Sequence, residues 1–169
     1  MANAYHGKYR GIVSDNQDPL QRGRIRAYVP DVFGSQESGW AWPCLPFAGD
    51  KMGFFAVPPV QASIWMEFEG GDPDYPIWTG CRWEDAKDMP ALPSSYKNAP
   101  GSVVLICTLG GHSILLDDDK NSGGITLTTS GGQKIVINSQ GIEIDNGNGA
   151  KIELKNNQVS INGGALEVT

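Results

Sequence analysis

Few side chains in this sequence of 169 residues could perform acid–base or metal chemistry, and those few are scattered. The two histidines, His6 and His112, lie far apart in the sequence. We expect His112, which follows a glycine pair, to be exposed or at an interface rather than to bind a metal. The sequence has no Ser/His/Asp series, no Cys-x-x-Cys pair and no glycine-rich phosphate loop. It therefore predicts a protein that is not an enzyme and holds no cofactor or metal.

Two acidic clusters could bind a cation or act as an acid pair. Asp117-Asp118-Asp119 offers the carboxylate oxygens that calcium prefers. Neighbouring residues on a strand point to opposite sides, so three consecutive aspartates converge only in a loop. We expect a solvated turn there, with calcium as the less favoured alternative. Glu67 and Glu69 with Asp72 and Asp74 are expected in a strand and its turn, without a catalytic role.

The sequence is acidic, with a formal net charge of −6, but its basic residues are unevenly placed. Residues 1–30 carry five basic and two acidic groups. Arg22, Arg24 and Arg26 alternate, so a strand would place them on one face. We interpret them as a solvated face or a docking surface for an acidic partner. A nucleic-acid partner is not expected, because such proteins usually carry a broad basic face.

Cysteines and apolar runs indicate where the protein is made. Cys44, Cys81 and Cys107 are odd in number and share no spacing typical of metal ligands. We expect buried, reduced thiols in a protein folded in a bacterial cytoplasm. The first residues lack a charged start followed by an apolar run, so no signal peptide is expected. The apolar runs are also too short for a membrane span.

The elements that must position these side chains change character at Pro100. Every Trp, Tyr, Phe and Pro lies at or before it, so the first part has the bulky side chains of a compact core. Alternating apolar and polar positions between Gly/Pro turns predict a small barrel. Its strands are expected over 9–13, 24–29, 63–69 and 76–81. We divide the chain into a barrel domain at 1–89, a stiff linker at 90–102 and a separate unit at 103–169.

The last unit repeats short apolar pairs, each spaced by one residue. Successive pairs start 10, 7, 10, 7 and 7 residues apart, with Gly, Asn and Ser between them. Each pair has the β-branched preference of a strand and points to one side. Gly and Asn would turn the chain at the corners of a prism. The pairs expected to form its core are Ile125/Leu127, Ile135/Ile137, Ile142/Ile144, Ile152/Leu154, Val159/Ile161 and Leu166/Val168.

One chain could not bury these pairs by itself. A coil of one chain would have open ends and little buried area, against an ordering cost of roughly 1–2 kcal/mol per residue. Three chains wound about one axis would give each backbone group a partner in another chain and remove the lateral edges. The sequence therefore predicts an all-β protein whose last unit is an intertwined triple-stranded β-helix formed by a homotrimer.

The first part of the sequence also resembles a known family. The motifs are GIVSDNQDPLQRGRIR at 11–26, WAWPCLPFAG at 40–49, GFF at 53–55 with PPV at 58–60, and WMEFEGGDPDYPIW at 65–78. In this order they are similar to the OB-fold domain of phage baseplate assembly protein V, the central spike of long contractile tails, and of VgrG proteins of type VI secretion. The repeat is similar to the short triple-stranded β-helix that follows this domain.

The resemblance implies a homotrimeric central spike of a contractile tail or injection-system baseplate. The trimer would sit on a hub protein below the inner tube, with Arg22, Arg24 and Arg26 as candidate hub-docking residues. It would carry a tip protein and pierce the target envelope on sheath contraction, touching the membrane only then. Inner tube or wedge components are further candidate partners. The protein would be made in the bacterial cytoplasm and assembled into the particle.

Departures from the family pattern refine this expectation. The sequence has no lysozyme-like insert after the barrel, so no cell-wall hydrolase activity is expected, and no His-x-His motif near its end for iron. VgrG's hub-like domain is absent, so the hub is expected to be a separate protein. An apolar end in water is unfavourable. We therefore expect a tip protein similar to PAAR-repeat proteins to contact Ala165, Leu166, Val168 and Thr169.

Two other functions fit parts of the sequence. A trimeric receptor-binding or adhesin fibre would share the repeat but not the barrel motifs, and no aromatic residue lies near the carboxy terminus to stack on a sugar. An OB-fold that binds single-stranded nucleic acid would use aromatic residues as stacking platforms, but the acidic charge opposes this. The spike is the preferred interpretation.

Overall fold

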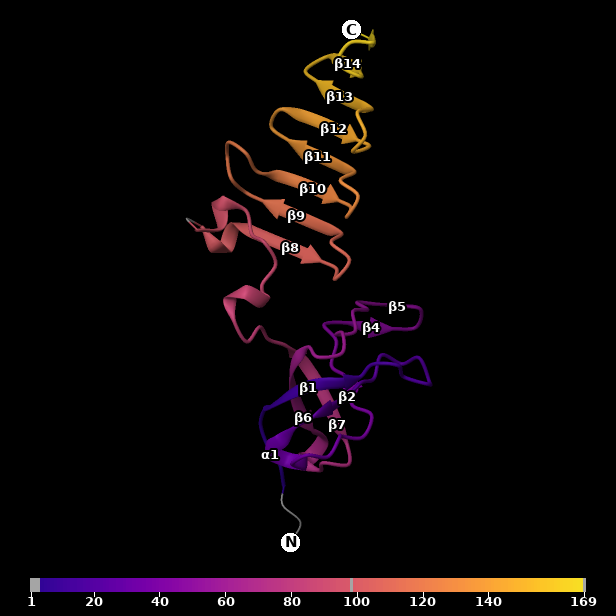
Figure 1. The fold of residues 1–169 in the computed structure, drawn as a ribbon, viewed down its shortest axis with the longest axis vertical. Helices are drawn as coiled ribbons and strands as arrows, with labels where there is room; N and C mark the ends of the chain where they lie inside the picture. The colour runs from indigo at the N-terminus through magenta and orange to yellow at the C-terminus, as the bar shows by residue number, and fades with distance from the viewer. Residues whose placement is uncertain (1–3, 98, 169) are drawn as a thin grey trace. The chain divides into compact units, whose positions relative to one another are not determined.

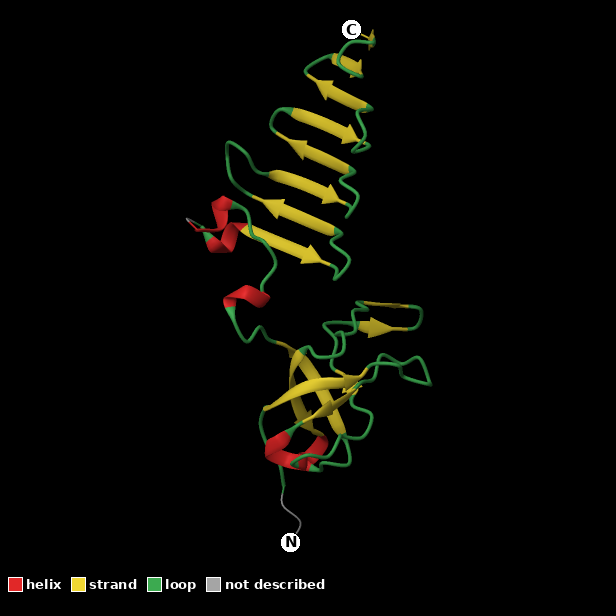
Figure 2. Ribbon diagram, in the orientation of Figure 1, coloured by secondary structure: helices red, strands yellow, loops and turns green. Residues whose placement is uncertain are grey.

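A computed structural model of the chain describes residues 4–97 and 99–168, the last two without their side chains. The chain divides into two compact units, Met1–Met89 and Pro90–Thr169. Strands make up most of the regular structure in both units (Figure 2). The predicted all-β fold class is therefore confirmed.

The first unit contains a five-stranded sheet in the order β2-β1-β6-β7-β3 (Figure 1). Neighbouring strands are antiparallel except β3 and β7, which are parallel. Register shifts in the β1–β2 and β6–β7 pairs bend the strands, as bulges do. The strands are β1 (Tyr9–Asp15), β2 (Arg26–Tyr28), β3 (Trp42–Pro43), β6 (Ser63–Phe68) and β7 (Pro76–Cys81), with a separate hairpin of β4 (Ala48–Gly49) and β5 (Met52–Gly53).

Helical segments are short. The α-helix α1 begins at a proline, whose missing N–H is not needed in the first turn of a helix. Among the described residues, no helix has the length and apolar character required to cross a membrane. The segments are α1 (Pro30–Phe33) and the 3-10 helices η1 (Glu69–Gly71), η2 (Ala86–Asp88), η3 (Ser94–Lys97) and η4 (Pro100–Ser102).

The first unit closes a core within one chain. Burial alternates along β6, where Ile64, Met66 and Phe68 face inward and the residues between them are half-buried. This is the pattern expected of a strand with one face on a core. The remaining buried hydrophobic side chains are Val13, Ile25, Ala27, Val29, Ala41 and Trp78.

Close packing in this core depends on Gly11 and on a hydrogen bond of Trp78. A Cβ at Gly11 would lie 3.2 Å from Cγ2 of Val29, so the strands approach closely only without a side chain there. The indole N–H of Trp78 donates to the backbone oxygen of Gly23 at 3.1 Å. This hydrogen bond satisfies the polar atom of a buried tryptophan, which would otherwise destabilise the core.

The second unit is an eight-stranded antiparallel sheet in which each strand pairs with its neighbours in sequence (Figure 1). Hairpins therefore connect the whole sheet as a meander. The strands are β8 (Val103–Cys107), β9 (Ser113–Asp117), β10 (Gly124–Thr128), β11 (Lys134–Asn138), β12 (Gly141–Asp145), β13 (Lys151–Lys155), β14 (Gln158–Ile161) and β15 (Leu166–Val168).

Turn length explains the spacing of the apolar pairs. Five residues, 129–133 and 146–150, connect β10 to β11 and β12 to β13, and the pairs across these turns start 10 residues apart. Two residues, 139–140 and 156–157, form turns on the other edge and give two of the intervals of 7, and the four residues 162–165 give the last one. Gly and Asn at positive φ, such as Gly132 and Asn156, adopt the backbone that tight hairpins require.

Two expectations differ from the structure. The sheet hydrogen bonds of the repeat lie within one chain, whereas we expected partners in other chains. The short turns reverse the chain instead of taking it round the corner of a prism, so each strand reaches the one before it. The cysteines are also exposed, not buried. Cys107, for example, ends β8 at the edge of the sheet.

Candidate functional site

One face of the second unit carries two continuous columns of apolar residues. Cross-strand pairing aligns them, because residues directly opposite each other in an antiparallel sheet share a face. The Val104 column contains Val104, Leu116, Ile125, Ile137, Ile142, Leu154, Val159 and Val168. The Ile106 column contains Ile106, Ile114, Leu127, Ile135, Ile144, Ile152, Ile161 and Leu166. We call the two columns together the apolar face.

The apolar face is open to solvent in the single chain. The large apolar residues of both columns between Val104 and Leu154, together with Leu166, are 36–56% exposed. Among the described residues from 90 onward, Asp117 alone is buried. A contiguous exposed surface of this kind marks an interaction site.

All twelve residues predicted for the core belong to these columns, although the side chain of Val168 lies outside the described structure. Sequence reasoning missed four members, Val104, Ile106, Ile114 and Leu116. They have the same one-residue spacing, but they stand in VVLIC and SILLD, where apolar neighbours on the opposite face hide the alternation. The turn sequences on either side could have identified them.

The opposite face of the sheet is polar from β10 onward except for Val136, and its charges are paired within the face. Glu143 accepts from Lys134 and Lys151 on the two flanking strands, at N–O distances of 2.9 and 3.0 Å. These two hydrogen-bonded ammonium groups hold the pKa of Glu143 below its usual value. Lys155 pairs with Glu153 at 2.7 Å. This face therefore suits contact with water, whereas the apolar face suits contact with protein.

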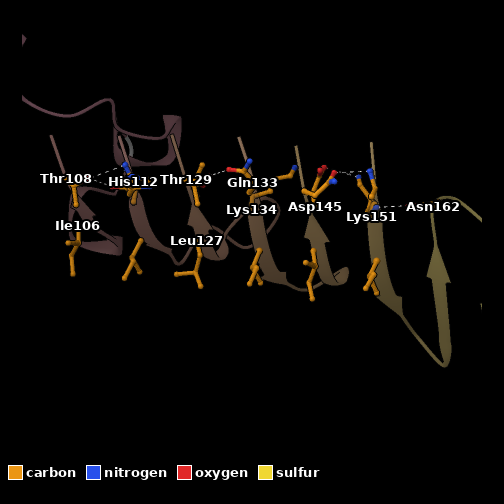
Figure 3. Close-up of a pocket in the computed structure, with 18 of the residues that line it drawn as sticks. Ile106, Thr108, His112, Leu127, Thr129, Gln133, Lys134, Asp145, Lys151 and Asn162 are labelled. Carbon is orange, nitrogen blue, oxygen red and sulfur yellow. Dashed lines mark hydrogen bonds and ion pairs between the residues drawn. The ribbon is translucent and has the colours of Figure 1, made fainter. Parts of the chain in front are cut away.

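A groove runs along one side of the apolar face (Figure 3). Its floor is the Ile106 column, and Figure 3 shows the side chains of Ile106 and Leu127 in the apolar row. Its wall is a polar row from the ends of the strands and their turns, including Thr108, His112 and Gln133. A long apolar floor beside a polar wall fits the edge of another polypeptide chain.

The acidic clusters stabilise turns and ion pairs. Asp117 accepts from the hydroxyl of Ser95 at 2.7 Å and from the N–H of Asp119 at 3.0 Å. The Asp119 carboxylate accepts from the N–H groups of Ser122 and Asn121, and these hydrogen bonds lower its pKa. Among the residues described, no three His, Cys, Asp or Glu side chains are grouped to hold a metal. Asp117 ends β9 and is buried, so the turn expected over all three aspartates begins only after it, at Asp118.

The remaining residues considered for chemistry also have structural partners. Glu67 in β6 pairs with Lys8 at 3.1 Å, and Asp72 accepts from the N–H of Asp74 at 3.0 Å. The His6 ring packs over Gly71, where a Cβ would lie 2.8 Å from the ring carbon Cε1. These contacts hold the turn between β6 and β7 against the amino-terminal segment.

Arg22, Arg24 and Arg26 gather around two tryptophans, although only Arg26 lies in a strand, β2. Arg22 lies over Trp42, Arg24 contacts both rings, and Arg26 lies 5.0 Å from the centre of the Trp40 ring. Such cation–π contacts hold the guanidinium groups in place.

Two of these arginines also have acidic partners. Arg24 donates to Asp18 at 2.6 Å, and the bonded guanidinium holds the pKa of Asp18 well below its usual range. Arg26 pairs with Glu37 at 3.0 Å. The stack is therefore partly neutralised inside the unit and is a weaker docking surface for an acidic partner than the sequence suggested.

The predicted tip contacts lie at the end of the meander. Ala165 and Leu166 are exposed, and β15 is the last strand of the sheet, paired with β14. Thr169 and the side chain of Val168 lie outside the described structure.

Comparison with known proteins assigns both units. The model of the type VI secretion system/phage-baseplate injector OB domain matches residues 9–83, and that of the phage baseplate V C-terminal trimerisation domain matches 102–167. The expected OB-fold domain is thereby confirmed, and the second match supports a homotrimer. The actin cross-linking toxin VgrG1 of Vibrio cholerae serotype O1 is 36% identical over 64 residues, which are 36% of this chain and 6% of that protein.

The match thus covers only a small part of VgrG1, and the toxin activity in that name belongs to that protein. The two family matches follow each other in the order that the sequence motifs indicated. The chain belongs to the family of phage baseplate V and VgrG-type spike proteins.

Proposed function

We propose that this protein is the structural central spike of a contractile tail or injection-system baseplate. In this role a homotrimer sits on a hub protein below the inner tube, carries a tip protein and pierces the target envelope on sheath contraction. The observation that carries the proposal is the apolar face, which runs over the whole eight-stranded sheet and is exposed in a single chain.

Three copies can bury this face around one axis. Each copy supplies one sheet, and the side chains of both columns meet those of the other two copies. Complete burial of a half-exposed Leu or Ile side chain contributes about 1 kcal/mol, and every strand of the sheet adds a pair. The trimer is therefore stabilised along its length rather than at one point.

The sheet geometry suits a component under axial load. Hydrogen bonds between neighbouring strands run along the direction in which the strands are stacked. A force along the axis of the trimer is then carried by the hydrogen-bond ladders and by a dry, close-packed interior, which has low compressibility. These properties favour puncture over a catalytic mechanism.

The two units are assigned to different partners. We assign the tip protein, similar to PAAR-repeat proteins, to β15, where Leu166 is 56% exposed and a strand edge is available for pairing. We assign the hub to the Arg22, Arg24 and Arg26 face. Arg22 is its most accessible arginine, because it is exposed whereas Arg24 and Arg26 are half-buried.

Reconstitution tests this function. The purified protein should bind a tip protein from the same particle in a ratio of three chains to one, measured by native mass spectrometry. Ala165→Asp should abolish that binding without changing the mass of the spike alone, because Ala165 is exposed in the turn before β15 and lies outside both apolar columns. Thr126→Asp, on the polar face, is the matched control. A trimer that binds neither hub nor tip would contradict the proposed function.

A further inference from the structure

Three turns of equal length lie on one edge of the second unit. They span residues 108–112, 129–133 and 146–150. In each turn, the first N–H donates to the last carbonyl oxygen at 2.9–3.1 Å. The fourth position is always a glycine at positive φ, between 85° and 94°. Each turn is therefore closed by its own backbone.

The three turns also pack on one another. The N–H of Ser130 donates to Nδ1 of His112 at 3.4 Å, which joins the first turn to the second. A Cβ at Gly147 would lie 3.1 Å from the backbone carbon of Gly132, so the third turn lies directly against the second. We call this continuous stack the turn ridge. The opposite edge, formed by residues 118–123, 139–140 and 156–157, carries two of the shortest possible turns.

The turn ridge makes the apolar face asymmetric. The groove takes its floor from the Ile106 column and its wall from the ridge, and no residue of the Val104 column is among its described lining residues. Figure 3 shows the polar wall and the apolar floor as two parallel rows. On its other side, beyond the Val104 column, the apolar face ends at the opposite edge of the sheet.

A cyclic trimer requires this kind of asymmetry. Its interfaces are heterologous, so each copy uses one surface toward the next copy and a different surface toward the previous one. We propose that the groove beside the turn ridge receives the opposite edge of the neighbouring copy, and that the ridge holds that edge in place. The occupant is a second copy because the groove is continuous with the apolar face of the trimerisation domain. This inference rests on the homotrimer of the proposed function.

Leu109 is the anchor of this contact. It is 94% exposed at the second position of the first turn. The equivalent positions in the other two turns are Ser130 and Gly147, so the turn forms without a large apolar side chain. Because Leu109 is not needed to close its own turn, its side chain is available to pack on the neighbouring copy.

A photo-crosslinker tests the contact. A benzophenone amino acid at position 109 of the full chain, whose trimeric mass is established first, should join two chains on irradiation. Mass spectrometry should locate the adduct in residues 118–123 of the other chain, the turn of the opposite edge nearest in level to the first turn. A trimer that gives no chain-to-chain adduct, or one joined elsewhere, would overturn the inference. Failure to trimerise before labelling would instead count against the proposed function.

A substitution gives an independent measure. Leu109→Ser, which copies the residue of the second turn, should lower the temperature at which the SDS-resistant trimer dissociates by several degrees. Leu20→Ser is the matched control, because Leu20 is also an exposed leucine in a loop, but in the first unit. An unchanged dissociation temperature for Leu109→Ser would exclude its role as an anchor.

Discussion

The two units of this protein contain strands with the same alternating pattern, but only the first unit buries the apolar side within the chain. In β6 of the first unit, alternate residues Ile64 and Met66 are fully buried within the chain. In β12 of the second unit, alternate residues Ile142 and Ile144 remain 36% and 42% exposed. The alternation sets which side of a strand is apolar, but only the elements packed opposite decide whether that side is buried. One unit is completed by its own chain and the other needs further copies.

A charge introduced into the apolar face should have the largest effect, because it lies on the surface through which the second unit contacts other copies. Ile144→Asp places a carboxylate in the Ile106 column, so three charges would meet near the trimer axis. An uncompensated buried charge costs about 3–5 kcal/mol per chain. Light scattering should then give the mass of one chain. Thr126→Asp on the polar face should remain trimeric, and a stable trimer of Ile144→Asp would show that this column does not face inward.

Loss of a core hydrogen bond should affect the first unit alone. Trp78→Phe removes the donor to the Gly23 oxygen and leaves that buried acceptor unpaired, at a cost of about 1–3 kcal/mol. Thermal denaturation should show a lower transition for the first unit, with the native mass unchanged. Trp83→Phe, at an exposed tryptophan, is the control. A change in oligomeric mass would show that the two units are not independent.

Acid should also weaken the first unit through Asp18. The hydrogen-bonded Arg24 guanidinium lowers the pKa of Asp18 in the folded protein, so its contribution is complete above the unfolded pKa of about 3.9. That contribution is lost as the pH falls from about 4 toward the lower folded pKa. Asp18→Asn should therefore be less stable than the unsubstituted protein at pH 7, and the difference in melting temperature should shrink below pH 4. A constant difference would exclude this ion pair as the cause.

The smallest effect is expected on the polar face of the second unit. Glu143→Gln removes the charge shared by Lys134 and Lys151, which are partly exposed. Surface ion pairs of this kind contribute about 0.2–1 kcal/mol, so the dissociation temperature of the trimer should change little and should respond to salt less than before. An effect as large as that of Ile144→Asp would contradict the division between the two faces.

The sequence was sufficient to predict many of the strands. Those expected over 63–69 and 76–81 correspond to β6 and β7, and the spacing of Ile135/Ile137 and its neighbours identified β10 to β15 of the meander, but not β8 and β9. The OB-fold motifs identified the family. Strand alternation and the family motifs both involve residues that are close together in the sequence, so both can be recognised without the structure.

What the sequence did not predict depends on contacts between distant residues. The alternation of Arg22, Arg24 and Arg26 was visible, but not the two tryptophans that stack between them or the ion pair of Arg24 with Asp18. The 10- and 7-residue intervals were equally visible. Their cause, hairpin turns of different lengths within one sheet, requires the strand pairing. The residue assignments to the trimer core, hub and tip remain predictions.

The most direct test of the account is the native mass of the full chain beside that of residues 1–100. Light scattering should give three times the chain mass of 18.2 kDa for the full protein, with a band that resists SDS without heating. The fragment should keep a cooperative thermal transition but have the mass of one chain. A monomeric full-length protein, or a fragment that forms a stable trimer, would contradict the claim that the second unit is completed by other copies of the chain.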